Sequence, residues 1–175
     1  MTTDRAPGPY VVVIGPPGVG KSTVAREIGA RTGRRVVDTD ALVEQREGRS
    51  VSDIFVTSGE PYFREAEQRA VLDSLTEEGI VLALGGGAPM TPGVASALAG
   101  HPVLFLDVGI ADAAKRIGFD TSRPLLAINP RQSWVRTMKA RRPTYEGLAR
   151  WQVDTSGRSV DAVVAEVLEA LEAQA

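Results

Sequence analysis

The 175-residue sequence contains no cysteine and only one histidine. The absence of cysteine excludes thiol catalysis, a disulfide framework and cysteine-based zinc sites. The single histidine, His101, precedes Pro102 and is expected to be a loop residue. Positive charge is not in excess either, because the sequence has 20 Lys and Arg residues against 22 Asp and Glu residues, which gives a net charge of −2. The sequence therefore lacks the broad basic field that supports nucleic-acid binding, and any anion site must be local.

Long apolar runs are also missing. No stretch reaches the roughly 18 apolar residues that a membrane-spanning helix needs. Residues 1–9 are polar and proline-rich, without the apolar centre of a signal peptide, so a flexible N-terminal segment is expected there. Residues 10–175 are enough for one domain with a core of its own. We expect a cytoplasmic protein with no membrane partner.

Short apolar runs alternate with helical patterns along the rest of the chain. Strands are expected at residues 10–14, 35–38, 80–84, 103–107 and 151–154. Helices are expected at residues 21–32, 61–77 and 160–171, the second opened by Pro61 at a first-turn position. This alternation predicts an α/β fold with a parallel sheet covered on both faces. The irregular stretch 118–130 is a candidate flap.

The segment Gly15 to Thr23 fits the pattern G-x-x-x-x-G-K-[ST] at every position. It follows an expected strand and precedes an expected helix, where backbone N–H groups and the helix dipole favour phosphate. Lys21 can reach the β- and γ-phosphates, and the Ser22 hydroxyl can ligate Mg²⁺. The alternative is a glycine-rich turn with no ligand. The complete motif favours nucleotide binding.

Two aspartates lie at the end of the second expected strand. If the chain is extended there, Asp38 and Asp40 project from the same side. One carboxylate near Mg²⁺ and another that accepts a hydroxyl proton would suit phosphoryl transfer to an alcohol. The alternative is that Asp40 caps the next helix and Asp38 merely ends the strand.

Three further features are candidates for acceptor binding. Arg64 and Arg141 could each bind a carboxylate or phosphate, or could be solvated surface residues. Gly85-Gly86-Gly87 follows an expected buried strand, where ligands collect in open α/β sheets, although a plain tight turn gives the same pattern. The run ending at Asp107 resembles a Walker B strand, but we favour a buried strand with a helix-capping aspartate.

Taken in order, these segments resemble the shikimate kinases over nearly the whole chain from Val11. The matching segments are Gly15 to Thr23, Val37-Asp38-Thr39-Asp40, Gly59-Glu60 with Phe63-Arg64, Leu84 to Ala88, Arg123-Pro124-Leu125-Leu126, and Arg141 with Pro143 and Tyr145. The resemblance implies a three-layer α/β/α P-loop NTPase fold of the nucleoside-monophosphate-kinase type, with a five-stranded parallel sheet and a lid at about residues 118–130. It implies transfer of the γ-phosphate of ATP to the 3-hydroxyl of shikimate, on the route to chorismate and aromatic amino acids. Val160 departs from the proline that many relatives have beside the adenine.

The resemblance also implies roles for single residues. Asp40 would hold the shikimate hydroxyls and help remove the proton, Lys21 would stabilise the transferring group, and Arg123 on the lid would close over the phosphates. Ser22 would ligate Mg²⁺, with Asp38 near the metal through water. The expected nucleotide-binding residues are Gly18, Val19, Gly20, Lys21, Ser22, Thr23, Arg116, Arg123 and Arg158. The expected shikimate-binding residues are Asp40, Arg64, Gly85, Gly86, Gly87 and Arg141, with the arginines taking the carboxylate.

Two alternatives remain at this point. One is a gluconate-kinase-like or nucleoside-monophosphate-kinase activity on the same fold. The other is a nucleotide-binding regulatory module without turnover, which would be expected to lack Asp40, Arg64 or Arg141; all three are present. We expect a monomer whose partners are ATP, Mg²⁺ and shikimate.

Overall fold

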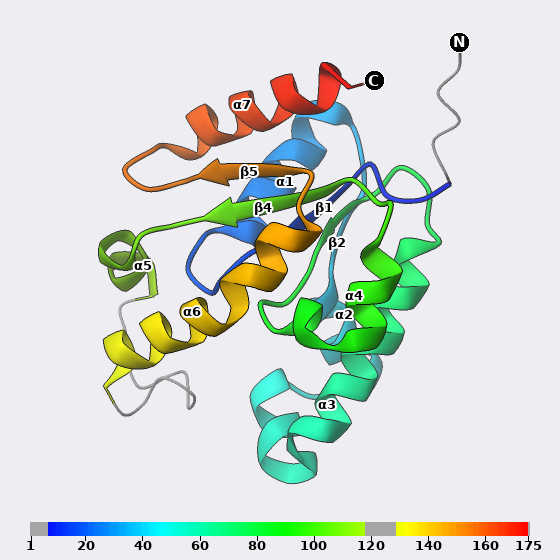
Figure 1. Ribbon diagram of the computed structural model, residues 1–175. Helices are drawn as coiled ribbons and strands as arrows, with labels where there is room; N and C mark the ends of the chain where they lie inside the picture. Colours follow the sequence, from blue (N-terminus) through cyan, green and yellow to red (C-terminus); the bar gives the residue numbers. More distant parts are fainter. Residues whose placement is uncertain (1–6, 118–128, 175) are drawn as a thin grey trace.

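The computed structural model describes residues 7–117 and 129–174, which build a five-stranded sheet between two layers of helices (Figure 1). The strands are β1 (Val11–Ile14), β2 (Val36–Asp38), β3 (Val81–Ala83), β4 (Val103–Asp107) and β5 (Trp151–Asp154). All neighbours are parallel, in the order β2-β3-β1-β4-β5. At the centre, Val12 is in register with Leu82 of β3 and Val103 of β4. The α/β fold with a five-stranded parallel sheet is thus confirmed.

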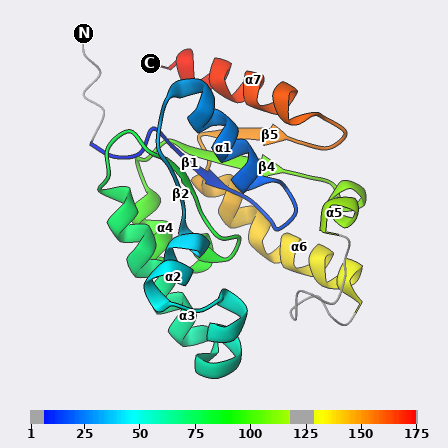
Figure 2. The same cartoon turned by 180° about the vertical axis from the view of Figure 1, so that it is seen from behind.

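Helices cover both faces of this sheet. They are α1 (Lys21–Thr32), α2 (Thr39–Glu47), α3 (Val51–Leu75), the 3₁₀ turn η1 (Ala88–Met90), α4 (Pro92–Leu98), α5 (Ile110–Ile117), α6 (Pro130–Leu148) and α7 (Val160–Glu172). Helices α1 and α7 pack together on one face, while α4, α6 and the end of α3 lie on the other (Figures 1 and 2). No helix in the described ranges is long and apolar enough to cross a membrane.

The main core surrounds the sheet. All four residues of β1 are fully buried, and β3 and β4 are almost as completely enclosed. Such apolar strands belong to a parallel sheet covered on both sides, because no strand face meets water. Because the central strands are buried, the carboxyl edge of the sheet is held in place. The loops after β1, β2 and β3 come together at this edge.

A second, smaller core lies between α2 and α3. It contains Val43, Ile54, Phe63, Ala66 and Ala70. The sequence did not predict α2 or the first part of α3, because both are short on periodic apolar residues. A bend separates the two parts of α3 at Gly59, whose φ of 83° and ψ of 165° are not helical, and Pro61 begins the second part. That second part ends at Leu75 rather than near residue 77.

Candidate active site

The loop between β1 and α1 has the form that the phosphate-binding motif predicts. Gly20 adopts a left-handed conformation with φ 88° immediately before α1, which a side chain would disfavour. A Cβ atom on Gly18 would come within 2.5 Å of Ile117 Cγ1, so α5 packs directly on this loop. The Lys21 ammonium donates hydrogen bonds to the carbonyl oxygens of Gly15 (2.8 Å) and Pro16 (3.0 Å). The lysine therefore lies over the loop.

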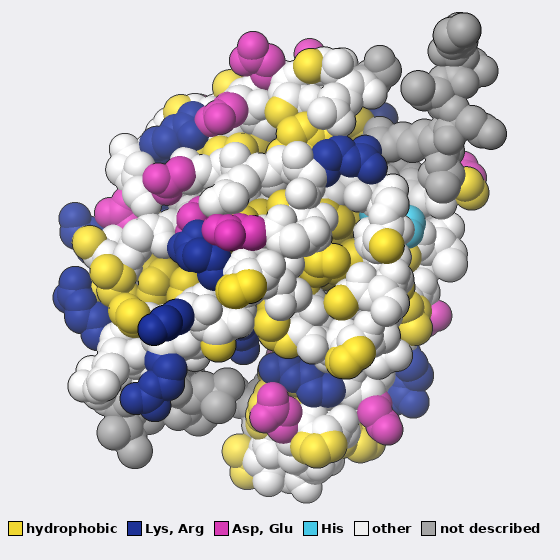
Figure 3. Space-filling view, in the orientation of Figure 1, with side chains coloured by type: hydrophobic (Ala, Val, Ile, Leu, Met, Phe, Trp, Pro, Cys, Tyr) yellow, Lys and Arg dark blue, Asp and Glu magenta, His cyan; other side chains and the backbone are white. Residues whose placement is uncertain are grey.

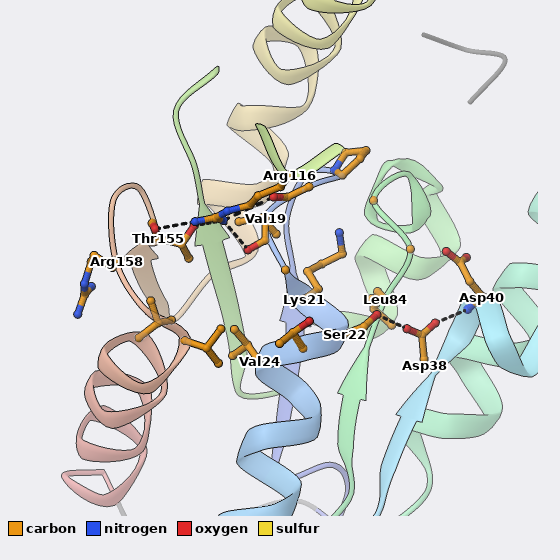
Figure 4. Close-up of a pocket in the computed structure, with 18 of the residues that line it drawn as sticks. Val19, Lys21, Ser22, Val24, Asp38, Asp40, Leu84, Arg116, Thr155 and Arg158 are labelled. Carbon is orange, nitrogen blue, oxygen red and sulfur yellow. Dashed lines mark hydrogen bonds between the residues drawn. The ribbon is translucent and has the colours of Figure 1, made fainter. Parts of the chain in front are cut away.

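Ser22 and Asp38 bring two oxygen groups together beside this loop. The Ser22 hydroxyl donates to Asp38 Oδ2 at 2.6 Å, as Figure 4 shows. Mg²⁺ prefers oxygen ligands and usually keeps several waters and phosphate oxygens, so it needs few protein ligands. A hydroxyl and a carboxylate at the end of a phosphate loop fit that preference. The described residues contain no group of three or more acidic, histidine or cysteine side chains that could hold a metal alone.

The two aspartates are not both extended, and the alternative in which Asp40 caps the next helix is wrong. Asp38, not Asp40, caps α2: its Oδ1 accepts from the N–H groups of Asp40 (3.0 Å) and Ala41 (3.3 Å). Asp40 lies in the first turn of α2, because the helix begins at Thr39 directly after β2. This turn directs the Asp40 carboxylate towards the glycine triplet, since a Cβ on Gly85 would lie 2.7 Å from its Oδ1.

Asp40 shares this position with a second carboxylate, that of Glu67. The side chain of Glu67 is 1% exposed, and its Oε2 would lie 3.0 Å from a Cβ on Gly85. Burial raises the pKa of Asp40, and the charge of Asp38 adds to the rise while that of Lys21 opposes it. Burial likewise raises the pKa of Glu67, against the opposing charge and hydrogen bond of Arg64. Both carboxylates are thus poised to hold or accept a proton more readily than exposed ones.

The two expected acceptor-binding arginines lie against the rest of the triplet. The Arg64 guanidinium donates to Glu67 Oε1 at 2.8 Å, and its Nη2 would be 2.5 Å from a Cβ on Gly87. Arg141 Nη1 would be 3.2 Å from a Cβ on Gly86. Each glycine therefore lets a charged group approach the backbone. The triplet is more than a tight turn, because side chains there would displace the charged groups.

Glu67 is the site residue that the sequence analysis missed. It stands three residues after Arg64 on α3, a spacing at which helical side chains meet. That spacing was a usable signal, but an acidic residue on a helix is usually exposed. Its burial depends on the glycine triplet, which only the tertiary structure brings beside it.

The opposite end of the site is built from α5, the loop after β5 and α7. Arg116 donates to the carbonyl oxygen of Val19 (3.1 Å) and to the hydroxyl (3.0 Å) and carbonyl (2.9 Å) of Thr155. Arg158 donates to the carbonyl of Asp154 at 3.1 Å and also binds Glu166. A cavity of about 640 Å³ runs from Arg158 past Lys21 to Asp40. Figure 4 shows Thr155 and Arg158 at one end, the two aspartates at the other, and Lys21 between them.

The cavity collects most of the expected site residues. Its lining includes Gly18, Val19, Gly20, Lys21, Ser22, Thr23, Asp38, Asp40, Gly85, Gly86, Arg116 and Arg158. Arg64, Gly87 and Arg141 are not among these lining residues, but the two arginines lie beside the triplet. Arg123 and most of the expected lid, residues 118–128, lie outside the described residues.

Helix α6 connects both parts of the site to the sheet. The indole N–H of Trp134, near its start, donates to the carbonyl of Pro17 in the phosphate loop at 3.1 Å. Further along, Arg142 makes a two-point ion pair with Asp107 at 2.7 and 2.9 Å. The helix-capping role expected for Asp107 is therefore wrong: its carboxylate fastens β4 to α6, and α5 begins only at Ile110.

Fold and site together define a P-loop phosphotransferase of the nucleoside-monophosphate-kinase type. The sequence profile of shikimate kinase matches residues 17–172. A shikimate kinase of Streptomyces avermitilis is 48% identical over 164 residues, which is 94% of this chain and 96% of the relative. This chain belongs to the shikimate kinase family.

Solved structures agree with that assignment. A shikimate kinase from Acinetobacter baumannii in complex with shikimate superposes with a TM-score of 0.90 at 27% identity, over 97% of this chain and 96% of that one. A gluconokinase from Sinorhizobium meliloti superposes with a TM-score of 0.63 at 21% identity, over 98% and 95% of the two chains. The second likeness shows only that the fold is shared.

Proposed function

We propose that this ATP-dependent kinase transfers the γ-phosphate of ATP to the 3-hydroxyl of shikimate, giving shikimate 3-phosphate and ADP for chorismate and aromatic amino-acid biosynthesis. The observation that carries this proposal is the cavity, in which Lys21 of the phosphate loop lies between the Thr155 end and Asp40. The family membership of the chain and the complex of its Acinetobacter relative with shikimate support the choice of acceptor. A cytoplasmic monomer remains our expectation.

Nucleotide binding is assigned to the phosphate loop and the far end of the cavity. The N–H groups of Gly18 to Thr23 and the dipole of α1 would hold the phosphates. Arg116 and Arg158 would flank the adenine. Ser22, with Asp38 through water, would hold Mg²⁺, which supplies positive charge to the phosphates when bound.

Proton removal is assigned to Asp40. A base works best when its pKa approaches the operating pH, and burial together with the Asp38 charge raises the pKa of Asp40 in that direction. Lys21 would stabilise the charge that develops on the transferring phosphoryl group. Arg123 would close over the phosphates as the lid excludes water. Arg64, Arg141 and the glycine triplet would hold shikimate, with the two arginines at its carboxylate.

The deciding experiment is product identification. The purified protein is incubated with MgATP and shikimate, gluconate or AMP in parallel, with ADP release coupled to NADH oxidation and phosphorus NMR of the product. We expect turnover with shikimate and a phosphorus resonance coupled to the proton at carbon 3. Turnover of gluconate alone, or phosphorylation at another hydroxyl, would overturn the proposal.

A further inference from the structure

Tyr145 is a buried hydroxyl group that the proposed mechanism leaves without a role. Its side chain is fully enclosed near the end of α6, with the ring packed at a tilt on Phe105 at 5.1 Å between centroids. Its hydroxyl donates a hydrogen bond of 2.6 Å to the carbonyl oxygen of Gly86. That distance is at the short end for an O–H···O bond, so the donor is well placed.

This hydrogen bond orients a whole peptide group and not only its carbonyl. The Gly86 carbonyl and the Gly87 N–H belong to the same planar peptide, and the described residues contain no cis peptide. In a trans peptide these two groups point in opposite directions, so holding the carbonyl towards α6 turns the N–H away from α6. Within the described part of the chain no protein acceptor pairs with this N–H. It is available to a ligand.

The same hydroxyl lies among the acid-binding groups. Arg141 stands four residues earlier on α6, a spacing at which helical side chains are neighbours. Burial raises the pKa of Tyr145, and the positive charges of Arg141 and Arg64 oppose only part of the rise. The phenol therefore keeps its proton at neutral pH and can donate this hydrogen bond.

We propose that Tyr145 is a positioning residue for the acceptor acid: through its hydrogen bond to Gly86 it aims the Gly87 N–H and holds the triplet against Arg141. This inference rests on the proposed function, because it assigns the triplet and Arg141 to the carboxylate of shikimate. Tyr145 would act through the backbone, since the hydrogen bond that its hydroxyl donates goes to the Gly86 carbonyl.

The test removes only the hydroxyl. Tyr145→Phe keeps the ring on Phe105 but leaves the half-buried Gly86 carbonyl without this donor, a loss that corresponds to about three- to tenfold in an equilibrium constant. We expect the KM for shikimate to rise by about that factor while the KM for ATP changes less than about twofold. Tyr62→Phe is the matched control, because Tyr62 is exposed and its hydroxyl binds Glu47 at 3.0 Å. Its two KM values should match those of the unmodified protein.

A merely structural role would lower the amount of active enzyme, which leaves both KM values unchanged. The ligand-induced rise in Tm gives a second measurement that needs no turnover, because each ligand stabilises the folded state according to its own affinity. For Tyr145→Phe, the rise with shikimate should shrink and the rise with MgATP should persist. Unchanged KM and Tm responses to shikimate, or equal losses for both ligands, would overturn the inference. If the unmodified protein does not phosphorylate shikimate, it is the proposed function that fails.

Discussion

A methyl group added to the glycine triplet tests whether the two carboxylates are held where phosphoryl transfer needs them. In Gly85→Ala the new Cβ would lie 2.7 Å from Asp40 Oδ1 and 3.0 Å from Glu67 Oε2. The φ of Gly85 is outside the left-handed region, so the backbone itself accepts alanine. The Asp40 carboxylate must therefore retreat by about 0.7 Å to reach an ordinary separation of about 3.4 Å. Overpacking of this kind destabilises a fold by about 1–3 kcal/mol.

The catalytic effect should be larger than the effect on stability. A misplacement of about 1 Å at a reacting group lowers the rate about a hundredfold, so we expect kcat of Gly85→Ala to fall about ten- to a hundredfold. The assay is the coupled ADP-release assay at saturating MgATP and shikimate, with Tm measured in parallel. Gly147→Ala is the matched control, because nothing lies within 4 Å of its new Cβ in α6, and alanine should stabilise the helix by up to about 1 kcal/mol. A folded Gly85→Ala protein with kcat within twofold of the original would refute this placement of Asp40.

Four further substitutions separate the roles of neighbouring groups. Asp40→Asn should lower kcat by about 10²–10⁴-fold with ATP binding nearly intact, and it should raise Tm at neutral pH because it removes a buried negative charge. Arg141→Ala should raise the KM for shikimate by about ten- to a hundredfold with little change in Tm, whereas Arg64→Ala should also destabilise the fold by about 3 kcal/mol, because it leaves Glu67 buried without its partner. Trp134→Phe should raise the KM for ATP by about two- to tenfold, because it removes the hydrogen bond to Pro17.

Each of these expectations can be contradicted. Because the pKa of Asp40 is raised by folding, its ionised form lowers stability above that pKa and the penalty disappears as pH falls through it. The gain in Tm of Asp40→Asn must therefore shrink as the pH is lowered, and a constant gain would refute the assignment. Equal losses of Tm in the two arginine variants would contradict their different pairing. A normal KM for ATP in Trp134→Phe would show that this bond does not support the phosphate loop.

Local patterns predicted the strand, loop and helix of the phosphate motif well. The phosphate motif, the strand before it and α1 depend on neighbouring residues, and the structure has them at the expected positions. The residues expected to bind the acceptor do lie together around the glycine triplet, but their arrangement was not predicted. Asp38 caps α2 in place of Asp40 because the helix begins at Thr39, and no periodic apolar pattern predicts so short a helix. Asp107 was misjudged for a similar reason, since its partner Arg142 lies 35 residues away.

The order of charges along the triplet sets the orientation of an acceptor acid. Gly85 lies beside two carboxylates, while Gly86 and Gly87 lie beside two guanidinium groups. Arg64 is already paired with Glu67, whereas Arg141 forms no salt bridge in residues 7–117 and 129–174. A carboxylate near Gly85 would be repelled, but one near Gly86 would meet an arginine whose charge is not yet neutralised. The acid is therefore expected to bind with its carboxylate at the basic end and its hydroxyl groups at the acidic end, where Asp40 also lines the cavity that holds the phosphate loop.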